Sequence, residues 1–355
     1  EDPNGLQEVF SEAGLDPKDE RVALWVQHAA ALRGHPRHLG QHSGGMVIAA
    51  GRLDEVVPIE PASMPGRSVI QWDKEDCSEL GIIKVDLLGL GMLNALERAI
   101  PLVRATEGIE LDYAKLPPRD PQVYDLISRA DTIGVFQIES RAQMSTLPRL
   151  KPQCFYDLVI EIALIRPGPI VGQMVHPYMR RRDGIEPVTY AHSSLEPILA
   201  RTLGVPIFQE QILRMAMAVA GFTGGEAEEL RRAMGFKRSE ERMQSIQARL
   251  REGMVQNAIP PETRENIITQ ITSFALYGFP ESHSASFALI AYASAYLKTH
   301  HPGAFLCSLL NAWPMGFYSP ATLIKDAQRR GVSVQAIDVT QSDYACTLPD
   351  ARTVR

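Results

Sequence analysis

The distribution of apolar residues divides the chain into an N-terminal helix, a few isolated strands and a long helical region. Near the N-terminus, five apolar residues recur at helical spacing and share one face of a helix: Val22, Trp25, Val26, Ala29 and Leu32. Gly34 and Pro36 follow this pattern, and both residue types end helices. The spacing therefore predicts a helix within residues 1–34.

Three short apolar runs come next and predict β-strands. Residues 46–50 lie between glycines, so we expect a buried strand there, and residues 69–72 and 82–89 give two further candidates. Residues two positions apart in a strand lie on the same face, so Lys84 and Asp86 should point to one side. Together the three runs predict one small sheet.

The rest of the chain is helical and carries clear start and stop signals. Ser319 followed by Pro320 predicts the start of a helix, and Gly331 predicts its end. Thr223 and Glu226 have the spacing of a capping box, which predicts a second helix start. These signals place two helices without reference to their hydrophobic faces.

Apolar periodicity alone predicts three more helices and a late strand. Residues 158–165 are apolar enough for a buried helix, and 206–220 and 285–300 show helical periodicity. Residues 332–338 predict a terminal strand. The pattern as a whole therefore favours an α+β class that is mainly helical.

The composition is that of an ordinary globular protein. The chain has 355 residues, 45% hydrophobic and 22% charged, which is enough for two or three domains with cores of their own. Its formal net charge of −6 argues against a protein that binds polyanions over its whole surface. No apolar run reaches the ~18 residues of a membrane span, so we expect no membrane association.

Cysteines and histidines add little chemistry. The four cysteines are far apart and suggest neither a disulfide framework nor a zinc ribbon, so a reducing cytoplasm is the expected location. His35, His38 and His42 have spacings that resemble those of metal ligands, but the glycines and prolines around them predict a loop, which argues against zinc. The polar start without an initiator Met indicates a piece of a longer protein.

Lys84 and Asp86 form the first candidate site. A carboxylate and an ammonium on one face of a strand can present a metal ligand and a phosphate contact. The same spacing also describes an exposed strand whose neighbours form an ion pair. The pattern by itself leaves both interpretations open.

Arginine-rich segments form the second group of candidates. Arg166 lies between a buried helix and a Pro-Gly-Pro segment that fixes the backbone, and a rigid arginine suits bidentate phosphate binding or neutralises the helix dipole. Basic residues are dense further on, and the main ones are Arg180, Arg181, Arg182, Arg231, Arg232 and Lys237. They indicate either a polyanion-binding face or a solvated helix face.

Residues 277–287 are the last candidate. Aromatic and small hydroxyl residues lead there into a helix N-terminus, a place suited to base stacking and to anion binding. A helix cap with aromatic core residues explains the segment as well.

Taken together, these segments resemble one family, the C-family bacterial DNA polymerases, over nearly the whole chain. The similar motifs follow in the family's order: QWDKED (71–76) with IKVDLLGL (83–90), GVFQIESR (134–141), RPGP (166–169), FQEQ (208–211), LRRAM (230–234) and YGFPESHS (277–284). Residues 69–74, 91–93 and 311–318 are more similar to the error-prone, damage-induced branch than to the replicative alpha subunit, which is the nearer alternative.

The resemblance implies a fragment of a polymerase-beta-like nucleotidyltransferase palm joined to large helical fingers. It implies that residues 1–40 are the remainder of a thumb, 41–89 the last palm strands, 90–345 the fingers and 346–355 a truncated tail. The activity implied is two-metal transfer of deoxynucleotides to a primer 3′-hydroxyl. A non-catalytic DNA-binding module of the fingers type is the competing interpretation, and a metal phosphoesterase is a weak one.

The resemblance also implies roles for particular residues. Asp86 matches a metal-binding carboxylate for Mg²⁺, and Lys84 matches a catalytic lysine near the incoming triphosphate. Four residues match the nucleotide-binding face of the fingers: Arg166, Arg231, Arg232 and Lys237. Four more match the segment that contacts DNA or the nascent base pair: Tyr277, Ser282, His283 and Ser284.

The family's other two catalytic aspartates lie in an Asp-x-Asp strand that this chain lacks. One carboxylate cannot hold two divalent cations, so we expect the fragment to be inactive alone. The partners implied are primer-template DNA and deoxynucleoside triphosphates. Accessory mutagenesis proteins and a sliding clamp would bind through regions outside the chain.

Overall fold

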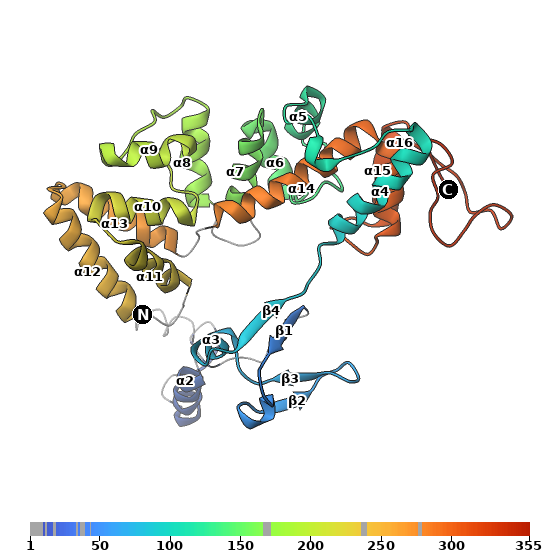
Figure 1. The fold of residues 1–355 in the computed structure, drawn as a ribbon. Helices are drawn as coiled ribbons and strands as arrows, with labels where there is room; N and C mark the ends of the chain where they lie inside the picture. The colour runs from blue at the N-terminus through green and yellow to red at the C-terminus, as the bar shows by residue number, and fades with distance from the viewer. Residues whose placement is uncertain are drawn as a thin grey trace. The chain divides into compact units, whose positions relative to one another are not determined.

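The computed structural model of the chain forms two compact units, Glu1–Leu88 and Gly89–Arg355. The residues that it describes are 10, 13–16, 19–32, 35, 40–42, 44–165, 172–235, 240–275 and 279–355. Helices dominate this described part, and its few strands are short (Figure 1). The mainly helical α+β class predicted from the sequence is therefore confirmed.

The first unit holds all the strands of the N-terminal region. Its elements in chain order are α2 (Glu20–Leu32), β1 (Gly45–Ile48), η1 (Leu53–Glu55), β2 (Ile59–Pro61), β3 (Ser68–Ile70), α3 (Lys74–Glu79) and β4 (Ile83–Asp86). The helix and the three strands expected from the sequence are all present, with β2 as an addition.

The predicted single sheet is wrong, because the strands form two separate antiparallel pairs. β1 pairs with β4, with Val47 opposite Lys84 and Gly45 opposite Asp86. β3 pairs instead with β2, a three-residue strand that ends in Pro61, a residue type that argues against a strand in the sequence. A pair of two short strands has few cross-strand contacts, so each pair contributes little stability by itself.

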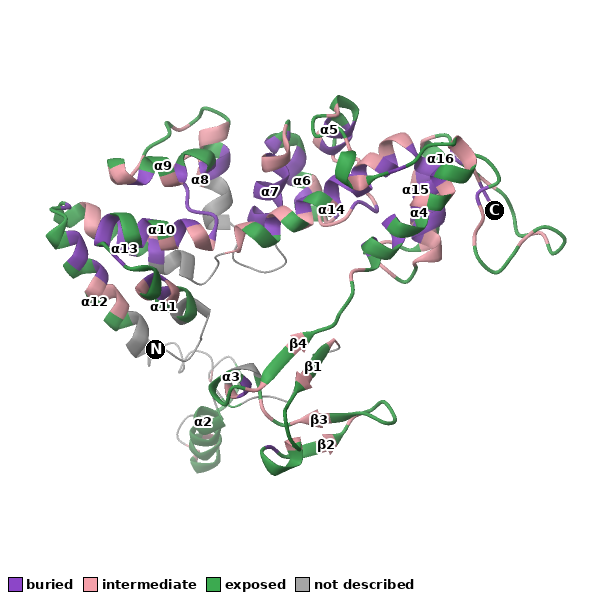
Figure 2. Ribbon diagram, viewed as in Figure 1, coloured by how far each residue is buried: buried purple, intermediate pink, exposed green. Residues whose placement is uncertain are grey.

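The strand at 46–50 is also not buried as predicted. Met46, Ile48 and Ile83 are 51%, 53% and 60% exposed, and most of β1 and β4 has the colour of exposed residues in Figure 2. Helix α3 contacts β4 but leaves these three side chains in solvent. Apolar side chains therefore stay in solvent although their sequence is typical of a core strand.

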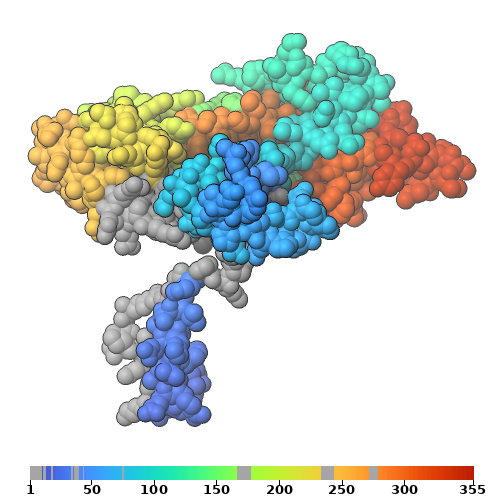
Figure 3. Space-filling view, turned by 60° about the horizontal axis from the view of Figure 1, so that its bottom comes forward, coloured from blue at the N-terminus to red at the C-terminus, as the bar shows by residue number. Residues whose placement is uncertain are grey.

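Helix α2 is amphipathic, as its spacing predicts, but it buries none of its residues. Trp25 and Leu32 are 59% and 68% exposed. In the space-filling view, the atoms of α2 are visible along its length (Figure 3, dark blue).

The second unit is almost entirely helical. Its helices are α4 (Gly91–Glu107), η2 (Tyr113–Lys115), α5 (Pro121–Ser128), α6 (Arg141–Leu150), α7 (Phe155–Leu164), α8 (Gly172–Arg182), η3 (Ser193–Leu195), α9 (Glu196–Leu199), η4 (Ala200–Thr202), α10 (Gln209–Ala220), α11 (Gly224–Gly235), α12 (Glu240–Gln256), α13 (Pro261–Ala275), α14 (Glu281–His300), α15 (Pro302–Asn311) and α16 (Pro320–Arg329). Two short strands, β5 (Ser333–Val334) and β6 (Thr353–Val354), pair in parallel.

The predicted caps are confirmed at atomic detail. The Ser319 side chain accepts the Thr322 N–H at the start of α16. At the start of α11, Glu226 accepts the Thr223 N–H at 2.8 Å and donates its own N–H to the Thr223 hydroxyl at 3.3 Å. Local hydrogen bonds therefore decide where these helices begin.

Two predicted helix starts differ, because the start of α10 and that of α14 touch each other. Phe208 forms a β-bridge with Phe279, and the Gln209 N–H donates to the Phe279 carbonyl at 3.0 Å, so α10 begins only at Gln209. Glu210 accepts the N–H of Glu281 at 2.9 Å, which satisfies the first turn of α14 four residues before the predicted start.

The C-terminal strand is shorter than predicted, and the C-terminal tail is hydrogen-bonded to the rest of the unit. Only Ser333–Val334 of the strand expected at 332–338 is extended. In the tail, the Cys346 N–H donates to the Asn311 side chain at 2.8 Å, and the Asn311 amide returns a bond of 2.8 Å to the Cys346 carbonyl. The tail is thus held on α15.

Helix α14 is the central element of this unit. Ala288, Ala291 and Ala295 lie in one core with α5, α6 and α7, and Ala293 and Leu297 lie in another with α4, α15 and α16. Small side chains let the neighbouring helices approach closely on several sides. α14 therefore belongs to both cores at once (Figure 1).

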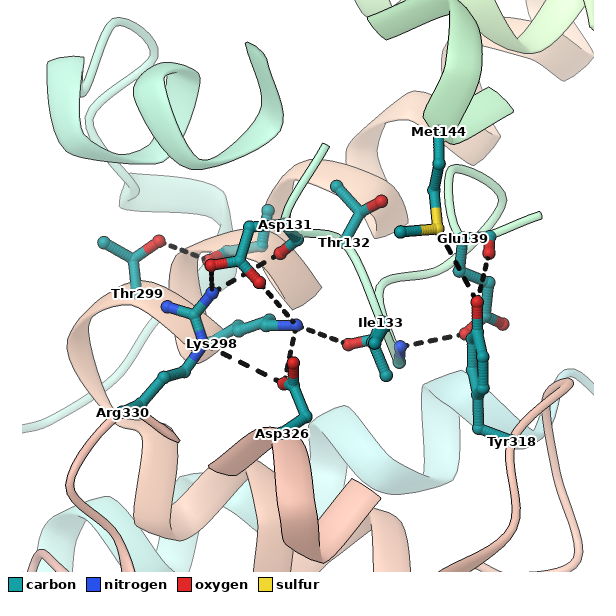
Figure 4. Close-up of polar contacts among 12 residues, drawn as sticks. Asp131, Thr132, Ile133, Glu139, Met144, Lys298, Thr299, Tyr318, Asp326 and Arg330 are labelled. Atoms are coloured by element: carbon teal, nitrogen blue, oxygen red, sulfur yellow. Dashed lines mark hydrogen bonds and ion pairs between the residues drawn. The ribbon is translucent and has the colours of Figure 1, made fainter. Parts of the chain in front are cut away.

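A buried lysine joins α14 to distant segments (Figure 4). Lys298 is 1% exposed, and its ammonium lies 2.8 Å from Asp326 of α16 and donates to the Ile133 carbonyl at 2.7 Å. Arg330 pairs with Asp131, which also lies 3.7 Å from the lysine. Burial lowers the pKa of Lys298, and Asp326 opposes that effect.

A buried carboxylate lies beside this network. Glu139 accepts the Gly134 N–H at 2.9 Å, and the Tyr318 hydroxyl donates to the Glu139 backbone carbonyl at 2.8 Å (Figure 4). Burial raises the pKa of Glu139 to about 7. Gly134 has a φ of +78°, a conformation that favours glycine. The turn at 134 and the segment at 318 are therefore tied together.

We expect Lys298→Ala to lower the free energy of unfolding by about 3–5 kcal/mol, since it empties a buried site and leaves the largely buried carboxylate of Asp326 without its nearest cation. Urea denaturation measures the loss. Lys325→Ala, an exposed lysine of α16, is the matched control and should change stability by less than about 0.5 kcal/mol. Lys298→Met combined with Asp326→Leu should recover at least half of the loss. A cost below about 1 kcal/mol for Lys298→Ala would contradict this role.

Candidate functional site

The Lys84 and Asp86 side chains both lie at the surface of β4. Asp86 is 60% exposed, accepts the Leu88 N–H at 2.9 Å and lies 3.5 Å from the imidazole of His42. Gly45, opposite Asp86, has no side chain, and a Cβ there would lie 3.2 Å from His42 and 3.3 Å from Lys84. The glycine therefore leaves room for a carboxylate, an imidazole and an ammonium at one end of the ladder.

His42 is the member of this group that sequence reasoning missed. The sequence around the histidines at 35, 38 and 42 predicts a loop and no zinc site, and it does not reveal that one of them, His42, lies beside Asp86 at the end of the β1–β4 pair. The available signal was the position of His42 just before the Gly44-Gly45 turn into β1.

The described residues do not complete a magnesium site. Mg²⁺ prefers several oxygen ligands in octahedral geometry, whereas Asp86 supplies one carboxylate and His42 a nitrogen. Across the described residues, no group of three or more His, Cys, Asp or Glu side chains could hold a metal ion. Asp86 is accessible for coordination, but it needs further ligands.

The start of α14 presents aromatic rings and a histidine. The His283 ring lies 5.0 Å from the Phe279 ring and 4.1 Å from the Phe287 ring, and Phe287 lies 5.1 Å from Phe136. His283 and Ser282 are exposed. This stripe could stack against a planar ligand.

Ser284 has a different role from the one expected. Its side chain is 0% exposed and donates to the Val159 carbonyl of α7 at 2.5 Å. The hydroxyl is therefore used between two helices and cannot contact DNA directly in this structure. Tyr277, like Arg166 and Lys237, lies outside the described residues.

Most of the arginines that suggested a polyanion face have protein partners. Arg231 donates to Glu228 at 2.6 and 2.9 Å, Arg232 lies 3.4 Å from the same carboxylate, and the two arginines lower the pKa of Glu228 to about 2. Their local charge excess is thus reduced. Each guanidinium remains at the surface, 44% and 67% exposed.

The arginine triplet at the end of α8 is structural. Arg182 lies 2.7 Å from Asp157 and donates to the Leu150 carbonyl at 2.8 Å. Arg181 donates to the Leu203 carbonyl at 2.7 Å, and Arg180 pairs with Glu186 at 2.7 Å. These contacts connect segments distant in sequence, so the triplet is no open cationic patch.

Two family models match the chain. The model of the bacterial DNA polymerase III alpha subunit finger domain matches residues 92–258, and that of the bacterial DNA polymerase III alpha NTPase domain matches residues 3–89. The chain belongs to the bacterial DNA polymerase III alpha family. The boundary between the two matches coincides with the boundary between the two units.

Curated relatives of this family member are named error-prone DNA polymerases. One from Anaeromyxobacter dehalogenans (strain 2CP-1 / ATCC BAA-258) is 55% identical over 354 residues, which cover 97% of this chain and 31% of that relative. Relatives from Alkalilimnicola ehrlichii and Pseudomonas fluorescens are 54% and 53% identical over 96% of the chain and 33% of their own length. The chain spans about a third of each.

No helix among the described residues is long and apolar enough to cross a membrane.

Helix α7, which leads to Arg166, contains a buried carboxylate without a partner. Glu161 is 0% exposed, and neither of its carboxylate oxygens has a hydrogen-bond partner among the described residues. Burial raises the pKa of Glu161 from 4.5 to about 8. Its folded-state pKa thus lies above the unfolded value, so its stabilising contribution is complete below about pH 4.5 and is lost as pH rises towards 8.

We expect Glu161→Gln to flatten the dependence of unfolding free energy on pH. Between pH 5 and 8 the wild-type chain should lose of the order of 2–4 kcal/mol more than the variant, because only the wild type must ionise a buried carboxyl. Urea denaturation at both pH values measures the difference. Glu252→Gln, at an exposed position of α12, should leave the slope unchanged, and an equal slope for Glu161→Gln would contradict the argument.

Proposed function

We propose that the whole protein is a DNA-directed DNA polymerase of the error-prone, damage-induced type, which adds deoxynucleotides to a primer 3′-hydroxyl. The observation that carries this proposal is the exposed Lys84 and Asp86 pair on β4, inside a segment matched by a polymerase III alpha model. The names of the relatives favour the error-prone branch over the replicative alpha subunit.

In this proposal, residues 1–40 belong to a thumb, 41–89 to the last strands of a polymerase-beta-type palm, 90–345 to the fingers and 346–355 to a tail. The unit boundary at Leu88 supports the division between palm and fingers. The whole protein would bind primer-template DNA and deoxynucleoside triphosphates in the cytoplasm. Accessory mutagenesis proteins and a sliding clamp would bind elsewhere on it.

Asp86 would be one ligand of Mg²⁺, and the remaining ligands would come from parts of the whole protein outside the described residues. The bound cation would neutralise charge on the phosphates. Lys84 would hold the negative triphosphate through its ammonium, and Arg166 and Lys237 would do so from the fingers. Arg231 and Arg232 would contribute less to triphosphate binding, because both pair with Glu228 and its negative charge offsets part of theirs.

The start of α14 would face the nascent base pair. His283 and Ser282 are exposed and would make direct contact, and the same role is proposed for Tyr277 from the sequence. Ser284 would act by fixing α14 on α7, because its hydroxyl is used in that contact. A misplaced α14 would move the whole aromatic stripe.

We expect Asp86→Asn in the full-length protein to lower primer extension by roughly a thousandfold or more while primer-template binding stays nearly unchanged, since the amide removes a metal ligand but no DNA contact. Extension of a labelled primer and anisotropy of the same duplex measure the two effects. Asp54→Asn, an exposed aspartate of the same unit, is the control. Turnover near wild type in Asp86→Asn would refute the assignment.

The 355-residue chain alone should show no template-directed synthesis with Mg²⁺ and all four nucleotides, because it offers one of the required carboxylates. A primer-extension assay on the purified chain, with the full-length protein as the positive control, measures this. Robust extension by the chain would contradict the account of the incomplete metal site.

A further inference from the structure

A cavity of about 440 Å³ lies between α7, the first turn of α14 and η4. Tyr156, Arg201 and Glu281 line it, together with Arg119 and Cys154. Glu281 and its neighbour Ala285 lie on a different face of α14 from His283 and Phe287, since two residues turn a helix by about 200°. The cavity is therefore distinct from the aromatic stripe.

A stacked pair of side chains forms one wall. The guanidinium of Arg201 lies 3.6 Å from the centroid of the Tyr156 ring, and the tyrosine hydroxyl donates to Glu281 at 2.8 Å. Arg201 is nevertheless 68% exposed, and its closest approach to Glu281 is 4.0 Å. The ring holds the guanidinium flat while its outer face stays open.

A second cavity, of about 570 Å³, adjoins the first at Arg119 and is lined also by Lys151 and Arg129. Arg129 pairs with Asp125 at 2.8 Å. Among the described residues, Arg119 and Lys151 have no side-chain ion pair or hydrogen bond. The two cavities thus present four cations and two carboxylates in a chain whose net charge is −6.

We propose that these two cavities, which we name the Arg119 groove, bind single-stranded nucleic acid. A base would stack on the open face of Arg201, and successive phosphates would contact Arg119 and Lys151. Planar stacking and a cationic track are the two features that bind single strands without sequence preference. The choice of nucleic acid over an acidic peptide rests on the proposed polymerase function.

Cys154 gives a reporter inside the groove, and Cys346 gives a control of intermediate exposure elsewhere in the same chain. We expect a saturating ten-residue oligothymidylate to slow alkylation of Cys154 at least about fivefold, because a strand stacked in the groove would cover the thiol that lines it. The rate at Cys346 should change less than twofold. Mass spectrometry of modified peptides measures both rates.

Arg119→Ala combined with Arg201→Ala should raise the oligonucleotide concentration for half-protection at least about tenfold. Arg201→Lys, which keeps the charge but loses the flat face, should give a smaller rise. The matched control is Arg104→Ala with Arg251→Ala, two exposed arginines paired with glutamates elsewhere, and it should leave protection unchanged. An unchanged Cys346 rate shows that each variant is folded.

Absence of protection at Cys154, or protection that survives the Arg119 and Arg201 changes, would overturn the proposal. Equal protection by polyglutamate would also overturn it, in favour of an acidic peptide. Primer extension by the full-length protein separates this failure from failure of the proposed function. If the full-length protein extends primers but Cys154 stays unprotected, only the proposed binding at the Arg119 groove is refuted.

Discussion

The structure of the second unit depends on the burial of one helix from several sides. α14 contributes to two hydrophobic cores, and its alanines and serines give the other helices room to pack against it. Polar bonds then fix the helix along its axis: Glu210 at its first turn, Ser284 against α7 and Lys298 against α16. These contacts therefore fix the positions of the exposed residues at the start of α14.

Because so many charged groups take part in packing, few remain for a ligand. The arginines of α8 bind carbonyls and carboxylates, and those of α11 pair with Glu228. Among the described residues, the accessible groups to which a ligand role is assigned lie mainly at the end of β4, at the start of α14 and in the Arg119 groove. Function is therefore to be sought at these places rather than across the basic segments as a whole.

Local patterns were sufficient to predict most helices, but not the contacts between them. Caps such as Ser319 and Thr223 are read from neighbouring residues, and the shared face of Lys84 and Asp86 follows from strand geometry alone. The burial of Ser284 depends on α7, which lies 125 residues earlier, so no local pattern reveals it. The approach of His42 to Asp86 was missed for the same reason, because the two residues lie far apart in the sequence. β2 is a local partner of β3, and it was missed because Pro61 argues against a strand.

The central claim is that Asp86 binds a catalytic metal ion in the whole protein. Its most direct test is a crystal of the full-length protein with primer-template DNA and an incoming nucleotide, soaked in Mn²⁺ and measured by anomalous diffraction. The account predicts an anomalous peak within about 2.5 Å of an Asp86 oxygen. Metal peaks that all lie farther than about 5 Å from this carboxylate, beyond direct coordination, would contradict it.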